Sequence, residues 1–310
     1  MKSVFRLTVP DDLPVLREFL ARAFGISVDT PAFDPALMTW KYWAPRGDWA
    51  EPRSYVLEAG GKITAHAGIW PRMVGEARGI QMIDWAAAKE APGAGLSLVQ
   101  KLAAMCDFMY SVGGSEMTRK VLPAFGFAEY TRQWNGAVPL RPLRQILTHQ
   151  NRGWKLAPRL VRNWLWSRAG VKAKGEAAAY RPEEPFLEYL SRCPAAKFRF
   201  YRFDKGRFAI SVVRGQARVA GVWLDESTTE NWTEAFALAR QVADGNELIA
   251  AGSDSMTREA AGRAGFHITP GAPVFLLDRK KKFAPPAGFQ FQLCDDDAAF
   301  LDTGSEAYWT

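Results

Sequence analysis

The residues best suited to bind an anion lie in a short glycine-containing turn. The sequence Glu90-Ala91-Pro92-Gly93-Ala94-Gly95 follows a long apolar stretch and precedes a helical pattern. Glycines let the main chain approach a ligand closely, and the start of a helix directs unpaired N–H groups and a positive dipole end outward. The pattern therefore predicts a phosphate site at residues 93–96. A tight strand-to-helix turn without a ligand fits the same residues.

Side chains that could move a proton are the second requirement of a reaction site. Candidates for the base are Asp84, Glu116 and His66, and candidates for the acid are Tyr110 and Tyr130. Asp84 interrupts an apolar strand pattern, where burial would raise the pKa of its carboxyl toward a useful value. A buried aspartate bonded to the main chain is the alternative. Glu116 could be only a helix-dipole partner, and a lone strand histidine is more often a packed residue than a catalyst.

Composition predicts a globular protein with two domains. The 310 residues include 48% hydrophobic and 24% charged residues, and the length suits two domains of about 150 residues each. No apolar run reaches the roughly 18 residues of a membrane span, and the N-terminus lacks a signal-peptide pattern, so we expect a cytoplasmic protein. Cys106, Cys193 and Cys294 lie far apart, which indicates neither a disulfide nor a metal site.

An internal repeat divides the chain. Residues 113–127 (GGSEMTRKVLPAFGF) align without a gap with residues 252–266 (GSDSMTREAAGRAGF), and six of the fifteen positions are identical. Strand-like and helix-like segments precede both stretches in the same order, so we expect a duplicated unit. Thr118-Arg119 recurs as Thr257-Arg258, which favours a structural role for the pair, although Arg119 could still reach a phosphate.

Periodicity assigns the elements of the first copy, residues 1–138. Strands are predicted over 3–9, 54–59, 62–70, 79–88, 107–112 and 127–138, and helices over 11–24, 35–43, 94–106 and 116–125. Gly60-Gly61, between two of these strands, indicates a hairpin.

The second copy, residues 183–282, repeats this plan in shorter form. Helices are predicted over 183–192, 230–243 and 255–264, and strands over 198–204, 207–213, 216–225, 246–251 and 266–278. The repeat offset places Trp232 opposite Gly93, so side chains would keep a phosphate away and this copy would instead shape an acceptor cleft. Part of the C-terminal tail, residues 283–310, is expected to be loosely held.

A basic connector, residues 139–182, joins the two copies. From Arg141 to Lys174 nine residues are Lys or Arg and none is acidic, which suits a polyanion or a solvated basic helix. The segment 156–170 is amphipathic. Its apolar stripe is predicted to contain Leu160, Val161, Trp164 and Leu165. Such a helix could contact a membrane surface peripherally, or it could pack its Trp face between the two domains.

The order of these elements resembles the GNAT (Gcn5-related N-acetyltransferase) superfamily. In that family a loop with the pattern Gln/Arg-x-x-Gly-x-Gly/Ala joins the fourth strand to the third helix; residues 90–95 match its glycines but begin with Glu90. A Gly-Phe pair after the fourth helix is matched by Gly126-Phe127 and Gly265-Phe266. The resemblance implies an α/β fold of two tandem GNAT-like domains, the second degenerate.

The resemblance also implies a function. It indicates an N-acyltransferase that moves an acyl group from acetyl-CoA or another acyl-CoA to a small-molecule amine bound between the domains. The main chain of the strand before the loop would bind pantetheine, and N–H groups of the loop would hold the pyrophosphate. The implied cosubstrate-binding residues are Trp85, Ala86, Ala88, Gly93, Ala94, Gly95, Leu96 and Arg119. The tyrosine that the family often uses as the acid is replaced by Leu122 and, in the second copy, by Ala261.

Two alternatives stay open. Fem-type aminoacyltransferases resemble tandem GNAT domains and use aminoacyl-tRNA, which the basic stretch 141–174 would suit, whereas the Gly-x-Gly loop favours CoA over nucleic acid. A non-catalytic ligand-binding protein could retain the fold, and Glu90 and Leu122 favour that interpretation.

Overall fold

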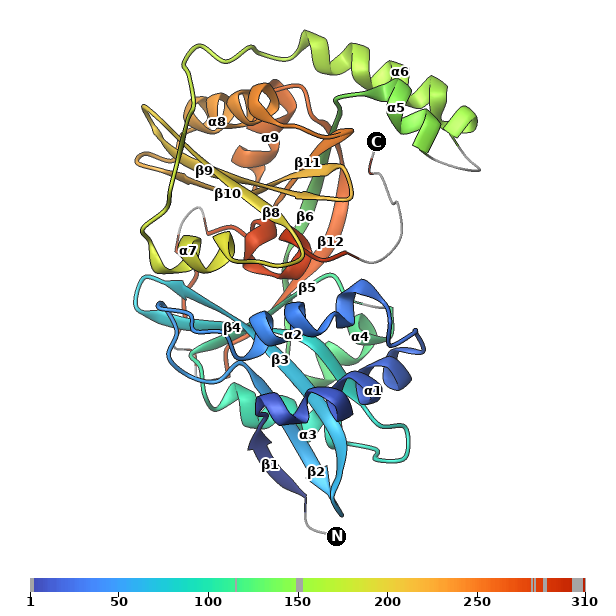
Figure 1. Cartoon of the computed structure of the whole chain (residues 1–310). Coiled ribbons are helices and arrows are strands. Elements are labelled where there is room, and N and C mark those ends of the chain that lie inside the picture. The colour runs from blue at the N-terminus through green and yellow to red at the C-terminus, as the bar shows by residue number, and fades with distance from the viewer. Residues whose placement is uncertain are drawn as a thin grey trace. The chain divides into compact units, whose positions relative to one another are not determined.

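The structure is a computed structural model that describes residues 3–114, 116–148, 153–279, 281, 283–286, 289–302 and 309 (Figure 1). It divides into two compact units, each made of two pieces of the chain. Unit 1 contains Met1–Tyr130 and Pro273–Pro286, and unit 2 contains Thr131–Ala272 and Ala287–Thr310. Within the described residues, no helix combines the length and the apolar character needed to cross a bilayer.

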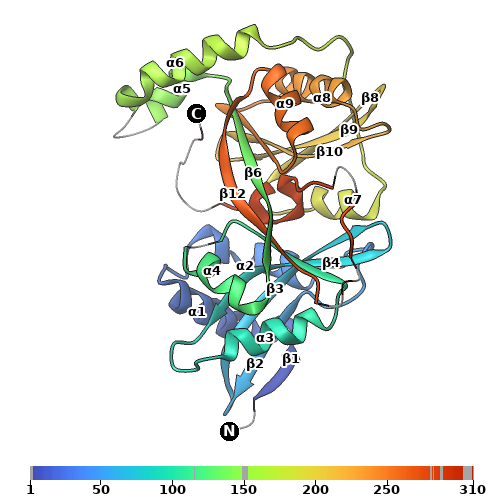
Figure 2. The same cartoon turned by 180° about the vertical axis from the view of Figure 1, so that it is seen from behind.

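Unit 1 is a mixed sheet with helices on both faces. Its elements are β1 (Val4–Leu7), α1 (Leu13–Phe24), α2 (Pro35–Tyr42), β2 (Ser54–Ala59), β3 (Lys62–Val74), β4 (Ala77–Ala87), α3 (Ala94–Ala103), β5 (Phe108–Val112), α4 (Glu116–Val121) and the end of β12 (His267–Leu277). The strand order is β1-β2-β3-β4-β5-β12, and only β4 and β5 of these neighbours run parallel. Figures 1 and 2 show α1 and α2 on one face of the sheet and α3 on the other.

Local sequence explains where helices α1 and α2 begin and end. Helix α1 has a proline in its first turn, which suits a position where no N–H partner is needed, and it ends at Gly25 with a φ of 68°. Asp34 caps α2 by accepting hydrogen bonds from the N–H groups of Ala36 (2.9 Å) and Leu37 (3.0 Å). The core beneath α3 contains Leu98, from that helix, packed against residues of β3 and β5.

Unit 2 repeats the same plan. Its elements are β6 (Ala128–Pro139), α5 (Pro142–Thr148), α6 (Gly153–Ala169), β7 (Ala178–Tyr180), α7 (Pro185–Ser191), β8 (Lys197–Phe203), β9 (Gly206–Val213), β10 (Gln216–Leu224), α8 (Thr229–Val242), β11 (Glu247–Gly252), α9 (Ser255–Arg263) and the start of β12. One α-helix lies between β7 and β8, where unit 1 has two between β1 and β2. The strand order is β12-β6-β11-β10-β9-β8-β7. The run β10-α8-β11-α9 matches β4-α3-β5-α4, as expected for a duplication.

The last strand of each copy is exchanged between the units. Strand β6, from the first copy, pairs with β11 of the second copy from Trp134↔Gly252 to Pro139↔Glu247. Strand β12, from the second copy, returns to pair with β5, with Val274 opposite Val112. The domain limits drawn from the sequence treat each copy as one continuous segment, whereas each unit contains a strand segment from the other copy.

Residues 289–302 of the C-terminal tail pack on unit 2. The short helices η4 (Leu293–Asp295) and η5 (Asp297–Ala299) lie against β10, and Phe291 and Phe300 are fully buried. The Gln292 side chain accepts a hydrogen bond from Val222 N (2.6 Å) and donates one to Val222 O (3.1 Å). The expectation of a loosely held tail is therefore not met by residues 289–302, while residues 303–308 and 310 lie outside the described residues.

Candidate functional site

The turn between β4 and α3 is shaped by its glycines. Ala91 N donates to Ala88 O (3.1 Å), and Gly93 is the N-cap of α3 with a φ of 83°. A residue with a side chain is strained at this φ, so the turn itself requires glycine at position 93. A Cβ atom at Gly93 would have no neighbour within 4 Å, whereas one at Gly95 would lie 3.3 Å from Ala87 Cβ. Gly93 thus leaves open space before the helix, and Gly95 lets α3 pack closely on β4.

The N-terminus of α3 has no side-chain cap. Ala94 N donates to Ala91 O (3.1 Å), and Ser97 N donates to Gly93 O (3.0 Å) to begin the helical bonding. The first-turn N–H groups of Gly95 and Leu96 have no intrahelical acceptor, because helix geometry supplies none at these positions. Together with the positive dipole end, such unpaired N–H groups can bind an anion, and the phosphate site at this turn stays a prediction. Of the four residues predicted to hold a phosphate, Ala94 is already engaged through its N–H.

A buried indole beside this turn also lacks an acceptor. Trp85 Nε1 has no hydrogen-bond partner among the described residues. It lies 3.5 Å from the position that a Cβ of Gly95 would take, and the Trp85 ring packs edge-on against Phe125 with centroids 5.7 Å apart. An unsatisfied buried donor costs about 1–3 kcal/mol. An anionic ligand at the turn would supply the missing acceptor, so the residues present fit the diphosphate of a CoA.

Strands β4 and β5 separate before β4 reaches the turn. Their parallel pairing covers only Gly79–Gln81 and Phe108–Tyr110, while β4 continues to Ala87. Ala88 N donates to Thr64 O on β3 (2.8 Å), so by strand alternation the main-chain groups of Ala87 and Trp85 point away from β3. This opened edge offers main-chain groups to an extended ligand that leads away from the turn.

A β-bulge directs Asp84 out of the sheet. The register between β3 and β4 shifts so that Asp84 and Trp85 both lie opposite Ala67, and Asp84 has a φ of 49°. Its Oδ2 accepts hydrogen bonds from Lys41 Nζ (2.5 Å) and Tyr42 Oη (2.5 Å), both from α2. The Lys41 side chain is 0% exposed and the Asp84 side chain 11%. The strained backbone is thus held by a buried ion pair.

The charge state of Asp84 corrects a prediction. Burial acts to raise the pKa of Asp84, but the Lys41 charge and the hydrogen bonds from Lys41 and Tyr42 outweigh it, so the pKa lies below its ordinary value. The expected rise in pKa was wrong, because the neutralising cation comes from a helix 43 residues earlier. Asp84 is therefore ionised, a weak base that positions Tyr42 and Lys41.

His66 supports the bulge from the neighbouring strand. It is completely buried, with Nδ1 2.9 Å from Asp84 O and Nε2 3.0 Å from Ser54 Oγ. Because a carbonyl can only accept, Nδ1 carries the proton and Nε2 accepts from Ser54. Burial lowers the pKa of His66 to about 4, so the ring is neutral. These contacts match a packed, hydrogen-bonded histidine, and its catalytic role stays a prediction.

The other predicted acid–base residues have different surroundings. Glu116 is exposed and pairs with Lys120 one turn later (2.7 Å). Tyr110 is completely buried beside Phe108, while Tyr130 is 40% exposed and burial of its hydroxyl raises its pKa. The structure thus brings Asp84 and His66 together, and nothing in it assigns a reaction step to the other three.

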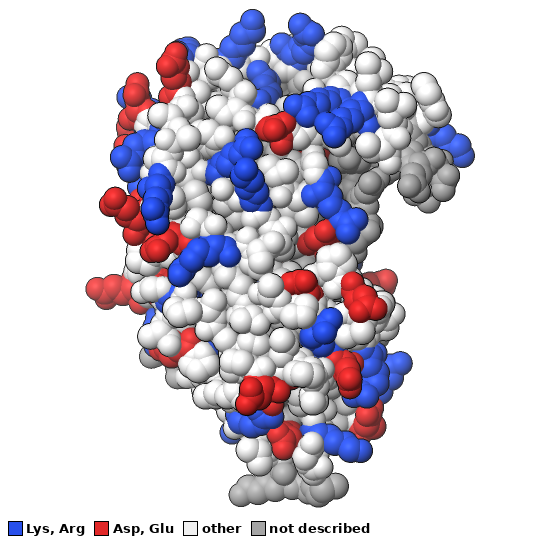
Figure 3. All heavy atoms as spheres, viewed as in Figure 1, with Lys and Arg blue, Asp and Glu red and all other residues white. Residues whose placement is uncertain are grey.

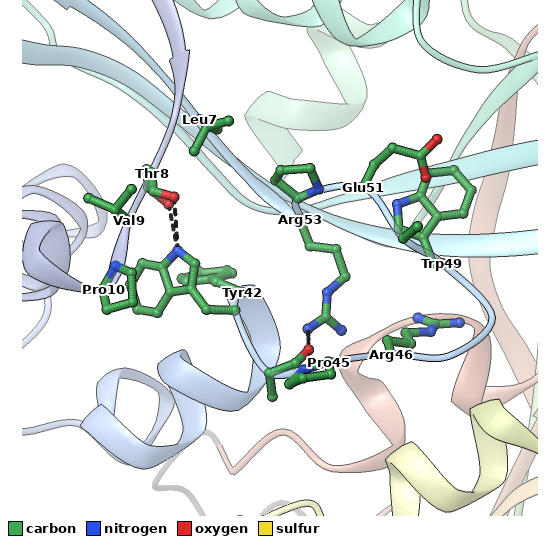
Figure 4. Close-up of a pocket in the computed structure, with 14 residues that line it drawn as sticks. Leu7, Thr8, Val9, Pro10, Tyr42, Pro45, Arg46, Trp49, Glu51 and Arg53 are labelled. Carbon is green, nitrogen blue, oxygen red and sulfur yellow. Dashed lines mark hydrogen bonds between the residues drawn. The ribbon is translucent and has the colours of Figure 1, made fainter.

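A cavity of about 400 Å³ lies on the α2 side of unit 1 (Figure 4). Its lining includes Thr8, Tyr42, Trp43, Arg46, Trp49 and Arg53. Arg53 Nη2 donates to the main-chain oxygens of Ala44 and Trp40, and Trp49 Nε1 is buried without a hydrogen-bond partner among the described residues. Tyr42 both lines the cavity and donates to Asp84, so its side chain links the cavity to the β4 bulge.

Sequence reasoning missed this cavity and the Lys41–Tyr42 pair. A signal was present in PALMTWKY, the sequence of α2, where one lysine stands among large apolar residues. Lysine is almost never fully buried unless it is paired. A buried lysine in such a helix therefore needs a carboxylate partner. Asp84, which interrupts an apolar strand pattern, was a candidate for that partner.

The second copy closes its equivalent turn with a side chain. Helix α8 begins at Thr229, and Thr228 Oγ1 accepts a hydrogen bond from Asn231 N (3.2 Å). The residue equivalent to Gly93 is therefore Thr228; the prediction that Trp232 stands there was wrong, because α8 has 14 residues where α3 has 10 and so begins about one turn earlier than the repeat offset implies. Trp232 lies in the first turn of α8 and is 3% exposed. A hydroxyl occupies the place where a phosphate would meet these N–H groups.

The repeated Thr-Arg pair has a structural contact in the second copy. Thr257 N donates to Asp254 Oδ1 (2.9 Å) and its hydroxyl to Asp254 Oδ2 (2.6 Å), while Trp134 Nε1 donates to Thr257 Oγ1 (3.1 Å). Asp254 thus caps α9, and Thr257 anchors the exchanged strand β6 through its hydroxyl. In the first copy Arg119 is exposed on α4.

Comparison with known proteins shows the fold. No protein-family profile matches the sequence, and no curated protein matches it significantly. Among solved structures, a GCN5-related N-acetyltransferase from Anabaena variabilis is similar with a TM-score of 0.57 and 10% identity, over 89% of this chain and 73% of that one. A tandem GNAT protein from the clavulanic acid biosynthesis pathway is similar with a TM-score of 0.54 and 10% identity, over 89% and 98%. The chain has the tandem GNAT fold.

Proposed function

We propose that unit 1 binds an acyl-CoA and transfers its acyl group to an amine. The tandem GNAT fold is the framework for this proposal, and the uncapped N-terminus of α3 is the observation that carries it. The diphosphate would accept hydrogen bonds from the N–H groups of Gly93, Gly95 and Leu96. Trp85 Nε1, buried and unsatisfied beside the turn, supports a ligand there.

The opened edge of β4 would hold the pantetheine arm. Main-chain groups of Trp85 and Ala87 point away from β3 on the side where β5 has separated. When bound, acyl-CoA supplies the thioester from which the acyl group leaves. A main-chain N–H on this edge would stabilise the negative charge that develops on the carbonyl oxygen. The predicted main-chain contacts from Ala86 and Ala88 are not part of this proposal, because these residues direct their main-chain groups toward β3, whereas a contact from Arg119 is.

The Lys41–Asp84–Tyr42 cluster would organise the amine. Oδ1 of Asp84 has no hydrogen-bond partner among the described residues, since Lys41 and Tyr42 both bind Oδ2. That oxygen can accept an N–H from an amine that enters through the cavity lined by Tyr42. With its lowered pKa, Asp84 would orient the amine rather than deprotonate an ammonium group. Tyr42, which lines the cavity, would be the proton donor of this cluster for the leaving sulfur.

A ligand-induced shift in melting temperature tests the proposal. Acetyl-CoA at about a hundred times its Kd should stabilise the protein by about 2.7 kcal/mol, which corresponds to about 5–10 °C for a unit of this size. Gly93→Val should abolish the shift. Gly61→Val is the matched control, because Gly61 also has a positive φ (74°) and open space around its Cβ position, but lies in the β2–β3 hairpin.

The outcomes separate the proposal from its alternatives. A shift in the wild type and in Gly61→Val, but not in Gly93→Val, supports acyl-CoA binding at the turn. A shift that persists in Gly93→Val means that the site lies elsewhere. No shift with any acyl-CoA, together with a salt-sensitive tRNA complex, favours aminoacyl transfer of the Fem type. Binding without turnover across a panel of amines favours a ligand-binding protein.

A further inference from the structure

Helices α5 and α6 carry a concentration of exposed apolar side chains. The four most exposed large hydrophobic residues of the described chain all lie on these two helices: Trp154 (80%), Leu147 (77%), Leu143 (76%) and Trp166 (61%). Single exposed apolar residues are ordinary on protein surfaces, but a group of this size on neighbouring helices marks an interaction site.

The exposed residues of α6 form a stripe of their own. Trp154, Pro158, Val161 and Leu165 follow the i, i+4, i+7, i+11 spacing of one helix face. All four are exposed. The residues that unit 2 buries, Leu160, Asn163 and Ser167, lie on roughly the opposite side of the helix at 100° per residue. The sequence-based prediction of one apolar stripe is corrected here: Leu160 faces inward, whereas Val161 and Leu165 face outward.

The inner face is fastened to unit 2, while the outer stripe is exposed in the described part of the chain. Arg240 Nη1 donates to Ser167 O (2.7 Å), and Val171 N donates to Arg263 O (2.8 Å) just after the helix ends. Helix α6 is also packed against α5, and the two lie side by side in both views (Figures 1 and 2). The outer stripe therefore has a fixed support and needs a partner outside unit 2.

Charge identifies the kind of partner. The segment 141–174 has nine basic residues and no acidic one. On the wheel of α6, Arg168 borders one edge of the apolar stripe, and Arg162 and Lys155 border the other. Figure 3 shows blue and white, without red, on the lobe that α5 and α6 form. A second copy meeting this face symmetrically would bring like charges together, whereas an anionic lipid surface would attract them.

We propose that the outer face of α5 and α6 docks on an anionic membrane surface. Trp and Leu side chains would enter the boundary between head groups and acyl chains, and the flanking Arg and Lys side chains would extend to the lipid phosphates. Since no described helix can cross a bilayer, α6 would lie in the plane of the surface. The inference does not depend on the proposed acyl transfer.

Flotation with lipid vesicles tests this docking. Full-length protein should float with phosphatidylcholine vesicles that contain about one third phosphatidylglycerol, and binding should fall in high salt or on pure phosphatidylcholine. Leu165→Glu and Trp154→Glu should each reduce the bound fraction about tenfold. Lys155→Glu should weaken binding to the anionic vesicles specifically. The matched control is Val15→Glu, because Val15 on α1 is as exposed (57%) as Leu165, and it should bind like the wild type.

Circular dichroism of each variant shows whether the fold is intact. Loss of flotation in folded Leu165→Glu and Trp154→Glu, with Val15→Glu unaffected, supports the proposal. Three results overturn it: no flotation of the wild type, equal flotation of all variants, or a dimer in sedimentation velocity that Leu165→Glu dissociates. The last result would assign the outer stripe to a second copy of the chain.

Discussion

Replacing Lys41 by methionine removes the cation that neutralises Asp84 and keeps most of the side-chain volume. Lys41 is 0% exposed and the Asp84 side chain 11%, so water can solvate the remaining carboxylate only in small part. Removing one partner of a buried ion pair costs about 3–5 kcal/mol, because an uncompensated buried charge remains. We expect Lys41→Met to lose that much free energy of unfolding at neutral pH.

The pH dependence separates this effect from simple packing damage. In the wild type the pKa of Asp84 is lowered, so its contribution is present above the unfolded-state value of about 3.9 and is lost as the pH falls through the folded-state pKa. In Lys41→Met, burial without the cation should raise the pKa of Asp84. The variant should therefore regain stability as the pH falls. The difference in free energy of unfolding between the wild type and Lys41→Met should then become smaller.

Urea unfolding followed by tryptophan fluorescence at a series of pH values measures the gap. The pKa of His66, lowered to about 4, makes both proteins less stable as the pH falls from about 6.5, so this effect largely cancels in the difference. The double variant Lys41→Met/Asp84→Asn should recover most of the loss, because it removes both charges. Two results would refute the buried ion pair. One is a loss of free energy of unfolding below about 1 kcal/mol in Lys41→Met, and the other is a difference from the wild type that does not change with pH.

Three further predictions concern the site and its copy. Glu90→Gln should lower the Kd for acetyl-CoA about twofold to fivefold at low salt, because an exposed carboxylate repels the diphosphate only weakly; calorimetry should show no change for the exposed control Glu76→Gln. Thr228→Ala should cost about 0.5–2 kcal/mol of stability through the lost α8 cap, measurable by urea unfolding, and an unchanged stability would contradict the capping role. The rate of acyl transfer should rise with pH up to the pKa of the amine, because Asp84, with its lowered pKa, is too weak a base to deprotonate an ammonium group; a plateau near neutral pH in a stopped assay would reveal a general base.

Local patterns were enough to predict most elements of the fold. Strand β2 was predicted over its observed limits, 54–59, because its strand pattern and the Gly60-Gly61 turn that follows both depend only on neighbouring residues. The start of α3 after Gly93 was predictable for the same reason. The repeat supplied the order of the second copy, since related segments fold alike.

Properties that depend on distant residues were not predictable. The sequence of β12 does not show that this strand pairs with β5, since a strand's hydrophobic pattern does not identify the strand beside it. The pKa of Asp84 depends on Lys41, which only the packing of α2 brings near. The position of Thr228 was misjudged because an offset taken from the best-matched segment was carried back across a helix that is four residues longer in the second copy.

A crystal structure with acetyl-CoA tests the central claim most directly. The uncapped turn should hold the diphosphate, with its oxygens about 3 Å from the main-chain nitrogens of Gly93, Gly95 and Leu96, while the turn before α8 stays closed by Thr228. A diphosphate bound elsewhere, or a Glu90 carboxylate folded over the turn in its place, would contradict acyl-CoA binding by unit 1.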